Sequence, residues 1–188
     1  MTEAVRRMER AITMTGRVVN GVSDEQWTLP TPCAEWDARA LLNHTVGGMR
    51  IFAAQLDGRE PEADHESDWL ADDPKAAYAS AAELDRATWN RPGALDTTLR
   101  LSFGAVPGPL AAQIHLTEVC VHGVDLAIAT DRRALLDEEL CEGLLRTVRQ
   151  MDGFDAFRVP GIFAEETPAP PGAPAHTRLL AFLGRTVS

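Results

Sequence analysis

The stretch "IHLTEVCVHGVDLA", residues 114–127, decides how the rest of the chain can be interpreted. It is mostly apolar, as a buried helix is, yet it carries four ionisable groups: His115, Glu118, His122 and Asp125. In an α-helix these positions fall within an arc of roughly 80° on one side. Glu118 and His122 are one turn apart, about 6 Å along the axis, so both can reach one small object. The pattern indicates either a buried polar network or a site that holds a metal ion.

A metal site on this helix needs at least a third ligand from another part of the chain. The segment "EWDARALLNHTVGGMRIFAAQL", residues 35–56, is predicted to be a helix with Asp37 as its N-cap. His44 lies at the edge of the apolar face of this helix, which makes it the best candidate donor. Gly47 and Gly48 follow it and remove bulk where another helix could approach.

His44, Glu118 and His122 form a set of two histidines and one carboxylate. Catalytic zinc sites use such a set and leave the fourth position open for water or substrate. His115 or Asp125 could be a fourth ligand, or could orient one of the imidazoles. A buried Glu–His ion pair without metal would also satisfy both groups, so the residues alone leave the structural interpretation open.

Composition limits the class of protein and its partners. A chain of 188 residues, 45% of them hydrophobic, is typical of one soluble globular domain. The formal net charge of −10 argues against nucleic acid as a partner, because phosphate binding needs clustered Lys and Arg. Apolar runs are broken well short of ~18 residues, so neither a transmembrane helix nor a membrane partner is expected. The start "MTEAVRRMERAITM" has no apolar signal core, and three cysteines make no disulfide framework, which favours a cytoplasmic location.

Hydrophobic periodicity predicts an all-α fold with little or no strand. A run at 97–103 could be extended, and Pro74 suits the first position of a helix. We expect residues 1–153 to form an antiparallel helical bundle. Residues 154–188, a proline-rich loop and a short terminal helix, are expected to be packed on it. The predicted helices span about 3–19, 38–56, 74–89, 109–130, 137–151 and 177–184.

Two motifs together carry a resemblance to a known family. "LPTPCAEWDARALLNHTVGG" (29–48), followed far downstream by "LTEVCVHGVDLA" (116–127), resembles the metal-binding domain of the mycothiol-dependent maleylpyruvate isomerases, part of the DinB/YfiT-like superfamily. The resemblance covers most of the chain, including the closing "RLLAFLGR" (178–185). It implies a DinB-like four-helix bundle with a short C-terminal extension. In that family a histidine of the second helix and a Glu-x3-His of the last bundle helix bind a divalent metal, usually zinc.

The resemblance places these metal ligands on His44, Glu118 and His122. It implies a metal-dependent transferase, isomerase or hydrolase acting on a small molecule, with a thiol such as mycothiol as co-substrate. The metal would lower the pKa of the thiol, and Asp125 or His115 would act as proton acceptor or ligand orienter. The alternatives are a metal- or ligand-binding protein without turnover and a purely structural polar network. Bundles of this superfamily often form homodimers, so self-association is also expected.

One feature argues against the isomerase reaction itself. The maleylpyruvate isomerase carries a further C-terminal domain that contributes to activity, whereas here the residues after position 151 are few and rich in proline.

The remaining reactive side chains favour ordinary structural roles. His65, in "ADHESD" (63–68), is interpreted as part of a solvated acidic loop, because flexible loops hold metals weakly. His176 follows a proline-rich stretch and is expected to be exposed. Cys33 and Cys120 are expected to be packed side chains rather than nucleophiles.

Overall fold

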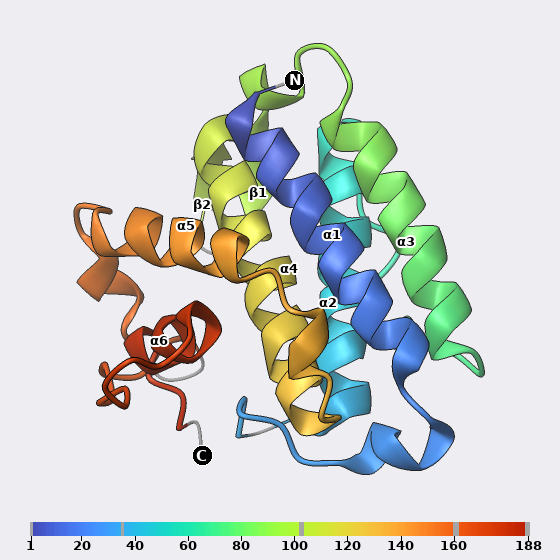
Figure 1. The fold of residues 1–188 in the computed structure, drawn as a ribbon. Coiled ribbons are helices and arrows are strands. Elements are labelled where there is room, and N and C mark those ends of the chain that lie inside the picture. The colour runs from blue at the N-terminus through green and yellow to red at the C-terminus, as the bar shows by residue number, and fades with distance from the viewer. Residues whose placement is uncertain (1, 35, 102–103, 160–161, 187–188) are drawn as a thin grey trace.

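Helices dominate this computed structural model, which describes residues 2–34, 36–101, 104–159 and 162–186 (Figure 1). The all-α prediction is confirmed, and each helix end lies within two residues of its predicted position. Short 3-10 turns, which the sequence did not predict, lie between the helices at Asp24–Thr28, Ala94–Asp96, Arg133–Leu135 and Phe154–Phe157. Within the described residues the α-helices are α1 (Glu3–Gly21), α2 (Ala38–Leu56), α3 (Pro74–Trp89), α4 (Gly108–Ala129), α5 (Glu138–Arg149) and α6 (Ala175–Phe182).

Helices α1 to α4 make the bundle. α1 packs on α4 and α3, and α2 packs on the same two helices from the other side, so α1 and α2 lie diagonally opposite each other. Aspartates mark three of the helix starts: Asp37 accepts a hydrogen bond from the Ala40 amide at 2.8 Å, and Asp73 and Asp137 cap α3 and α5 in the same way. Each cap contributes about 1 kcal/mol. The predicted N-cap of α2 is therefore confirmed.

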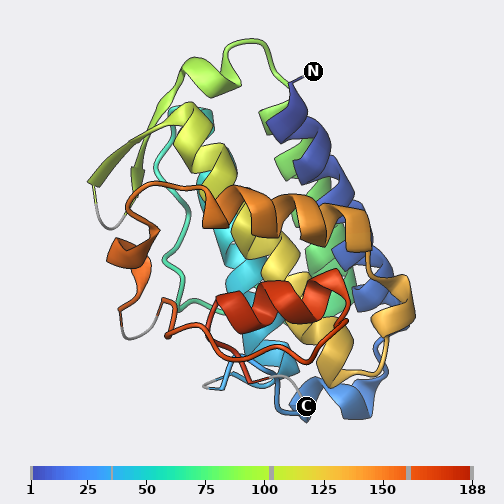
Figure 2. The ribbon, with the colours of Figure 1, turned by 60° about the vertical axis from the view of Figure 1, so that its left-hand side comes forward.

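α4 contributes more buried residues than any other helix of the bundle. Its 22 residues are apolar on nearly every side, a pattern typical of a helix covered all round. α5 and α6 lie side by side across its outer face (Figure 2), while α1 and α2 cover the inner side. No described helix combines the length and the apolar character needed to cross a membrane.

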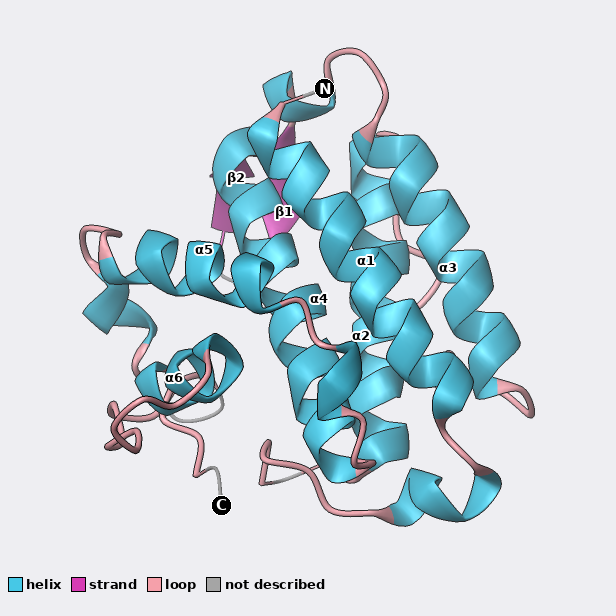
Figure 3. Cartoon of the chain, in the orientation of Figure 1, coloured by secondary structure: helices cyan, strands magenta, loops and turns pink. Residues whose placement is uncertain are grey.

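A small hairpin connects α3 to α4. Strands β1 (Thr98–Leu101) and β2 (Gly104–Pro107) pair antiparallel (Figure 3). Leu99 lies opposite Val106, and both side chains are in the core. The predicted extended run thus contains β1, although residues 102 and 103 of that run lie outside the described residues.

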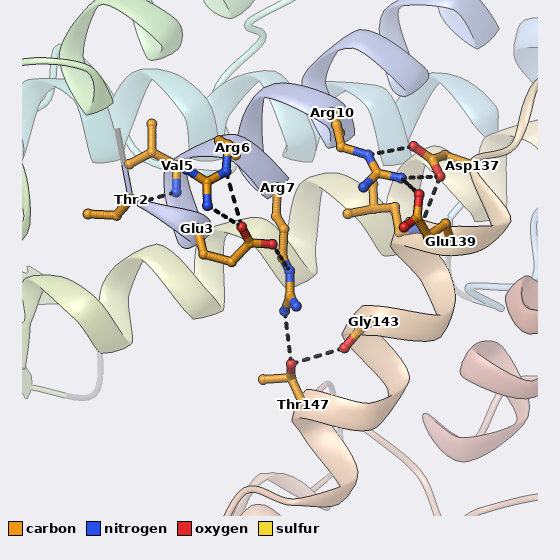
Figure 4. A network of polar contacts seen from close by, with 11 residues as sticks. Thr2, Glu3, Val5, Arg6, Arg7, Arg10, Asp137, Glu139, Gly143 and Thr147 are labelled. Atoms are coloured by element: carbon orange, nitrogen blue, oxygen red, sulfur yellow. Dashed lines mark hydrogen bonds and ion pairs between the residues drawn. The ribbon is translucent and has the colours of Figure 1, made fainter.

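Polar contacts join α5 to α1. Arg10 makes a two-pronged ion pair with Asp137 at 2.8 and 2.9 Å and also reaches Glu139 (Figure 4). One turn earlier, Arg7 donates to the hydroxyl of Thr147 at 3.2 Å. Because these groups are partly exposed, each pair contributes roughly 1 kcal/mol or less. Together they fix where α5 crosses the bundle.

The terminal helix begins two residues earlier than predicted and encloses His176. The side chain of His176 is buried and pairs with Glu138 at the start of α5, while its amide donates to the same carboxylate at 3.2 Å. The expectation that His176 is exposed is therefore wrong. A carboxylate from a distant helix supplies the partner that the local sequence does not show.

Gly123 allows α1 and α4 to come into close contact. A Cβ at Gly123 would lie 2.1 Å from the hydroxyl oxygen of Thr15 and 3.1 Å from its Cβ. That hydroxyl donates to the carbonyl of Val119 at 3.0 Å inside the core. The hydrogen bond and the close approach therefore depend on the missing side chain.

We expect Gly123→Ala to lower the free energy of unfolding by roughly 1–3 kcal/mol, because the added methyl overpacks the contact with Thr15. Urea denaturation would measure the change. The matched control is Gly143→Ala in α5, where the nearest atoms to a new Cβ lie 3.7 Å away on Arg7. Alanine is favoured over glycine in a helix by about 1 kcal/mol, so the control should be neutral or stabilising. Equal stabilisation in both variants would contradict the close approach.

Candidate metal centre

His44 of α2 and Glu118 and His122 of α4 lie in one cluster. His44 Nε2 is 3.6 Å from Glu118 Oε1, and the His44 and His122 rings have their centres 5.4 Å apart and stand nearly perpendicular, at 86°. A charge-assisted hydrogen bond would be shorter, at about 2.7–2.9 Å. Among the described residues no group of three or more His, Cys, Asp or Glu side chains is placed so that it could hold a metal ion as it stands. The cluster is assembled, and the assignment of its members as ligands stays a prediction.

The two glycines after His44 have different roles. A Cβ at Gly48 would lie 3.7 Å from Glu118 Oε2, so this glycine faces the neighbouring helix α4. A Cβ at Gly47 would lie 2.6 Å from the indole nitrogen of Trp69, which belongs to the loop between α2 and α3. Gly48 therefore leaves room beside the carboxylate, whereas Gly47 admits a loop rather than a helix.

Glu118 carries an unsatisfied oxygen. Its Oε2 is buried and has no hydrogen-bond partner within the described residues, and His115 Nδ1 lies 4.0 Å away. Burial opposes ionisation of this carboxyl, but the three surrounding imidazoles outweigh it and lower the pKa of Glu118 below its ordinary value. A buried anionic oxygen without a donor is costly. It marks a position where a cation would be favoured.

Asp125 and Arg185 lie behind His122, whose buried Nδ1 has no hydrogen-bond partner among the described residues. Its Nδ1 lies 3.5 Å from Asp125 Oδ2, and the fully buried Asp125 carboxylate receives Arg185 Nε at 3.0 and 3.2 Å. Burial lowers the pKa of His122, so the neutral imidazole that metal binding requires is favoured. Arg185 comes from the closing "RLLAFLGR" segment, which the structure therefore connects to the cluster.

His115 lies on the other side of Glu118 and is paired with α3. Its Nε2 is 2.8 Å from Asp85 Oδ2, and both side chains are at most 1% exposed. The ring is stacked on Phe52, with centres 4.5 Å apart. Burial alone would lower the pKa of His115, but the Asp85 carboxylate outweighs burial and raises that pKa. His115 and Asp85 thus form a buried ion pair behind the cluster.

Two aromatic rings that the sequence analysis did not assign to a site cover His44. Trp36 has its ring centre 4.5 Å from that of His44 and 5.6 Å from that of His122. His65 is stacked on His44 at 5.0 Å. His65 is half-buried, with its Nδ1 enclosed, so the interpretation of this residue as solvated is wrong. Burial and the nearby His44 also lower the pKa of His65. The sequence does contain one sign that this loop packs against the bundle: it carries Trp69, a large aromatic residue, among its acidic residues.

The pair of His115 and Asp85 should make stability depend on pH. Because the pKa of His115 is raised in the folded state, its stabilising contribution is complete below about pH 6.5, the unfolded value, and is lost as pH rises through the folded value. Asp85→Asn should cost roughly 3–5 kcal/mol at pH 6 and less at pH 9. Urea denaturation at both pH values would test this. Glu83→Gln, at an exposed position of the same helix, is the control. A cost that does not change with pH would argue against a charged His115.

Comparison with known proteins now defines the family. Residues 8–127 match the family described as the mycothiol maleylpyruvate isomerase N-terminal domain. Uncharacterized proteins from two strains of Mycobacterium tuberculosis are each 36% identical over 180 residues, which covers 95% of this chain and 96% of theirs. A crystal structure of a histidine-to-alanine mutant of the mycothiol-dependent maleylpyruvate isomerase shares the fold, with a TM-score of 0.60 and 15% identity over 78% of this chain and 66% of that one. This chain therefore belongs to the mycothiol maleylpyruvate isomerase N-terminal domain family.

Proposed function

We propose that this protein binds a divalent metal, best matched by zinc, through His44, Glu118 and His122. The observation that carries the proposal is the 3.6 Å separation of His44 Nε2 and Glu118 Oε1. That distance exceeds a charge-assisted hydrogen bond. Two donors on one tetrahedral zinc ion, each about 2.0–2.2 Å from it, are themselves about 3.4 Å apart. The separation therefore suits two ligands of a shared ion better than a direct pair.

The chemistry of the donor set fits a zinc ion. A carboxylate and two imidazoles are common zinc ligands, and three protein ligands leave one position open. The buried Glu118 Oε2 lacks a donor among the described residues, so a cation would satisfy it. When bound, zinc would lower the pKa of a water or thiol at the open position. Asp125 would orient His122 through its Nδ1, and His115 would support Glu118 from behind.

Family membership extends the proposal to an enzyme that uses a thiol. The name of the family refers to mycothiol and maleylpyruvate isomerase, so a low-molecular-weight thiol such as mycothiol is the co-substrate we favour. We propose a transferase or isomerase of this kind that acts on a small molecule. This chain aligns with 66% of the solved isomerase, and the isomerase reaction itself is not part of the proposal. A metal-binding protein without turnover is the alternative, favoured by the cover that Trp36 and His65 place on His44.

Glu118→Gln tests the site directly. Wild-type protein should hold about one zinc ion per chain, and the variant should hold little, because the amide has no charge to offer the ion. At a free zinc concentration 100 times the dissociation constant, binding should stabilise the wild type by about 2.7 kcal/mol. Chelator should therefore lower the thermal midpoint of wild type and leave that of the variant nearly unchanged. Metal analysis and thermal unfolding, each with and without chelator, are the measurements.

Glu83→Gln again serves as the matched control, because it makes the same chemical change at an exposed site on α3. It should retain the metal and the response to chelator. Wild-type protein that carries no metal and ignores both zinc and chelator would rule out the site and the enzyme with it. Metal binding without thiol-dependent turnover of small electrophiles would favour the alternative.

Replacing Arg185 should weaken both the fold and the site. Arg185→Met leaves the buried carboxylate of Asp125 uncompensated, at a cost of roughly 3–5 kcal/mol in unfolding free energy. Because Asp125 would lose its fixed position beside His122, zinc affinity should fall by roughly 10- to 100-fold. Arg178→Met is the control, since its pair with Glu142 is partly exposed and should contribute about 1 kcal/mol or less. Similar losses in the two variants would contradict a special role for Arg185.

A further inference from the structure

The loop between α2 and α3, residues 57–73, is fastened to the helix that carries His44. The side chain of Asn43 accepts from the Trp69 amide at 2.8 Å and donates to the Ser67 carbonyl at 2.9 Å. The Trp69 indole donates to the Asp64 carbonyl at 2.9 Å and occupies the space left by Gly47. These contacts flank position 65 on both sides. The loop is therefore held against α2 next to the cluster.

This attachment places the ring of His65 against that of His44, one member of the cluster. The ring lies on that of His44, with centres 5.0 Å apart. Its Cε1 and Glu118 Oε2 both lie within 4 Å of the point that a Cβ on Gly48 would occupy, at 3.8 and 3.7 Å. Both side chains therefore border the space that Gly48 leaves open. His65 Nδ1 is buried and has no hydrogen-bond partner among the described residues.

We propose that His65 is a fourth protein ligand of the metal, delivered by the 57–73 loop. This inference rests on the proposed function, since it needs a metal at His44, Glu118 and His122. Two imidazoles on one tetrahedral ion have ring centres about 5 Å apart. The separation of His44 from His122 is 5.4 Å, and that of His44 from His65 is 5.0 Å. Both distances from His44 are close to this value, and the rings of His44 and His65 are inclined by 25°.

A fourth protein ligand changes what the site can do at rest. Structural zinc sites are closed by four protein ligands, whereas catalytic sites keep one position open. With His65 bound, a thiol or water would have to displace a histidine from the loop before it could reach the ion. A cluster in which His65 only stacks on His44 would instead leave that position open at all times. The two cases predict different behaviour toward small ligands added in solution.

The test uses the full chain loaded with Co²⁺ in place of zinc, because the visible spectrum of bound Co²⁺ reports its ligands. We expect His65→Ala to shift the absorption bands and to weaken Co²⁺ binding, measured by competition with a chromophoric chelator. The loss should exceed about 10-fold, the lower limit for losing even an outer partner of a ligand. Imidazole added to the variant should restore the wild-type bands, and the same concentration should leave the wild-type spectrum unchanged.

Two further variants separate ligation from loop packing. Glu60→Ala, at an exposed position of the same loop, should match wild type in affinity and spectrum. Asn43→Ala releases the loop and should weaken Co²⁺ binding in wild type but have no further effect in the His65→Ala background. A His65→Ala protein with wild-type spectrum and affinity would overturn the fourth ligand while leaving the three-ligand site intact. Wild-type protein that binds neither Co²⁺ nor zinc would overturn the proposed function and this inference together.

Discussion

The arrangement of this bundle depends on one energetic cost, that of burying the ionisable side chains of α4 away from water. α4 is covered on nearly all sides and still carries a row of four ionisable residues on one face: His115, Glu118, His122 and Asp125. A buried charge is tolerated only when a partner of opposite sign or a good hydrogen-bond network accompanies it. Each neighbouring segment accordingly contributes one partner: α3 supplies Asp85 to His115, and the C-terminal segment supplies Arg185 to Asp125.

Glu118 and His122 stand apart from this pattern of pairing. The two outer members of the row, His115 and Asp125, have close partners at 2.8 and 3.0 Å. The inner two face His44 at longer range, and one oxygen of Glu118 has no donor among the described residues. The two outer residues thus have close ion pairs, whereas the two inner residues have only longer contacts with charged groups. Incompletely paired polar groups beside well-paired ones are expected at a ligand site, where a protein gives up some folding stability.

The helices and part of the cluster could be predicted because their signals are local. The cap at Asp37, Pro74 at a helix start and the apolar periodicity all act within a few residues. The spacing of Glu118 and His122 fixes their common face. The place of His44 at the edge of an apolar helix face, and then the family resemblance, pointed to His44. Asp85, Arg185, Trp36 and His65 were not predicted to contact the cluster, because each comes from a segment whose place depends on the assembled bundle. His65 is the clearest case: its acidic neighbours suggested solvent, and only the contacts of Trp69 with α2 bring its ring inside.

The pairing of Asp125 with Arg185 also has a consequence for synthesis. The two residues are separated by 60 positions, so a nascent chain contains the complete sequence of α4 long before the counter-charge of Asp125 has been made. Until then the acidic group would oppose burial of this end of the helix, and the emerging bundle would remain loosely closed. Final closure would follow translation of the "RLLAFLGR" segment. Fragments released before that point would expose apolar surface of α4, which proteases and chaperones recognise.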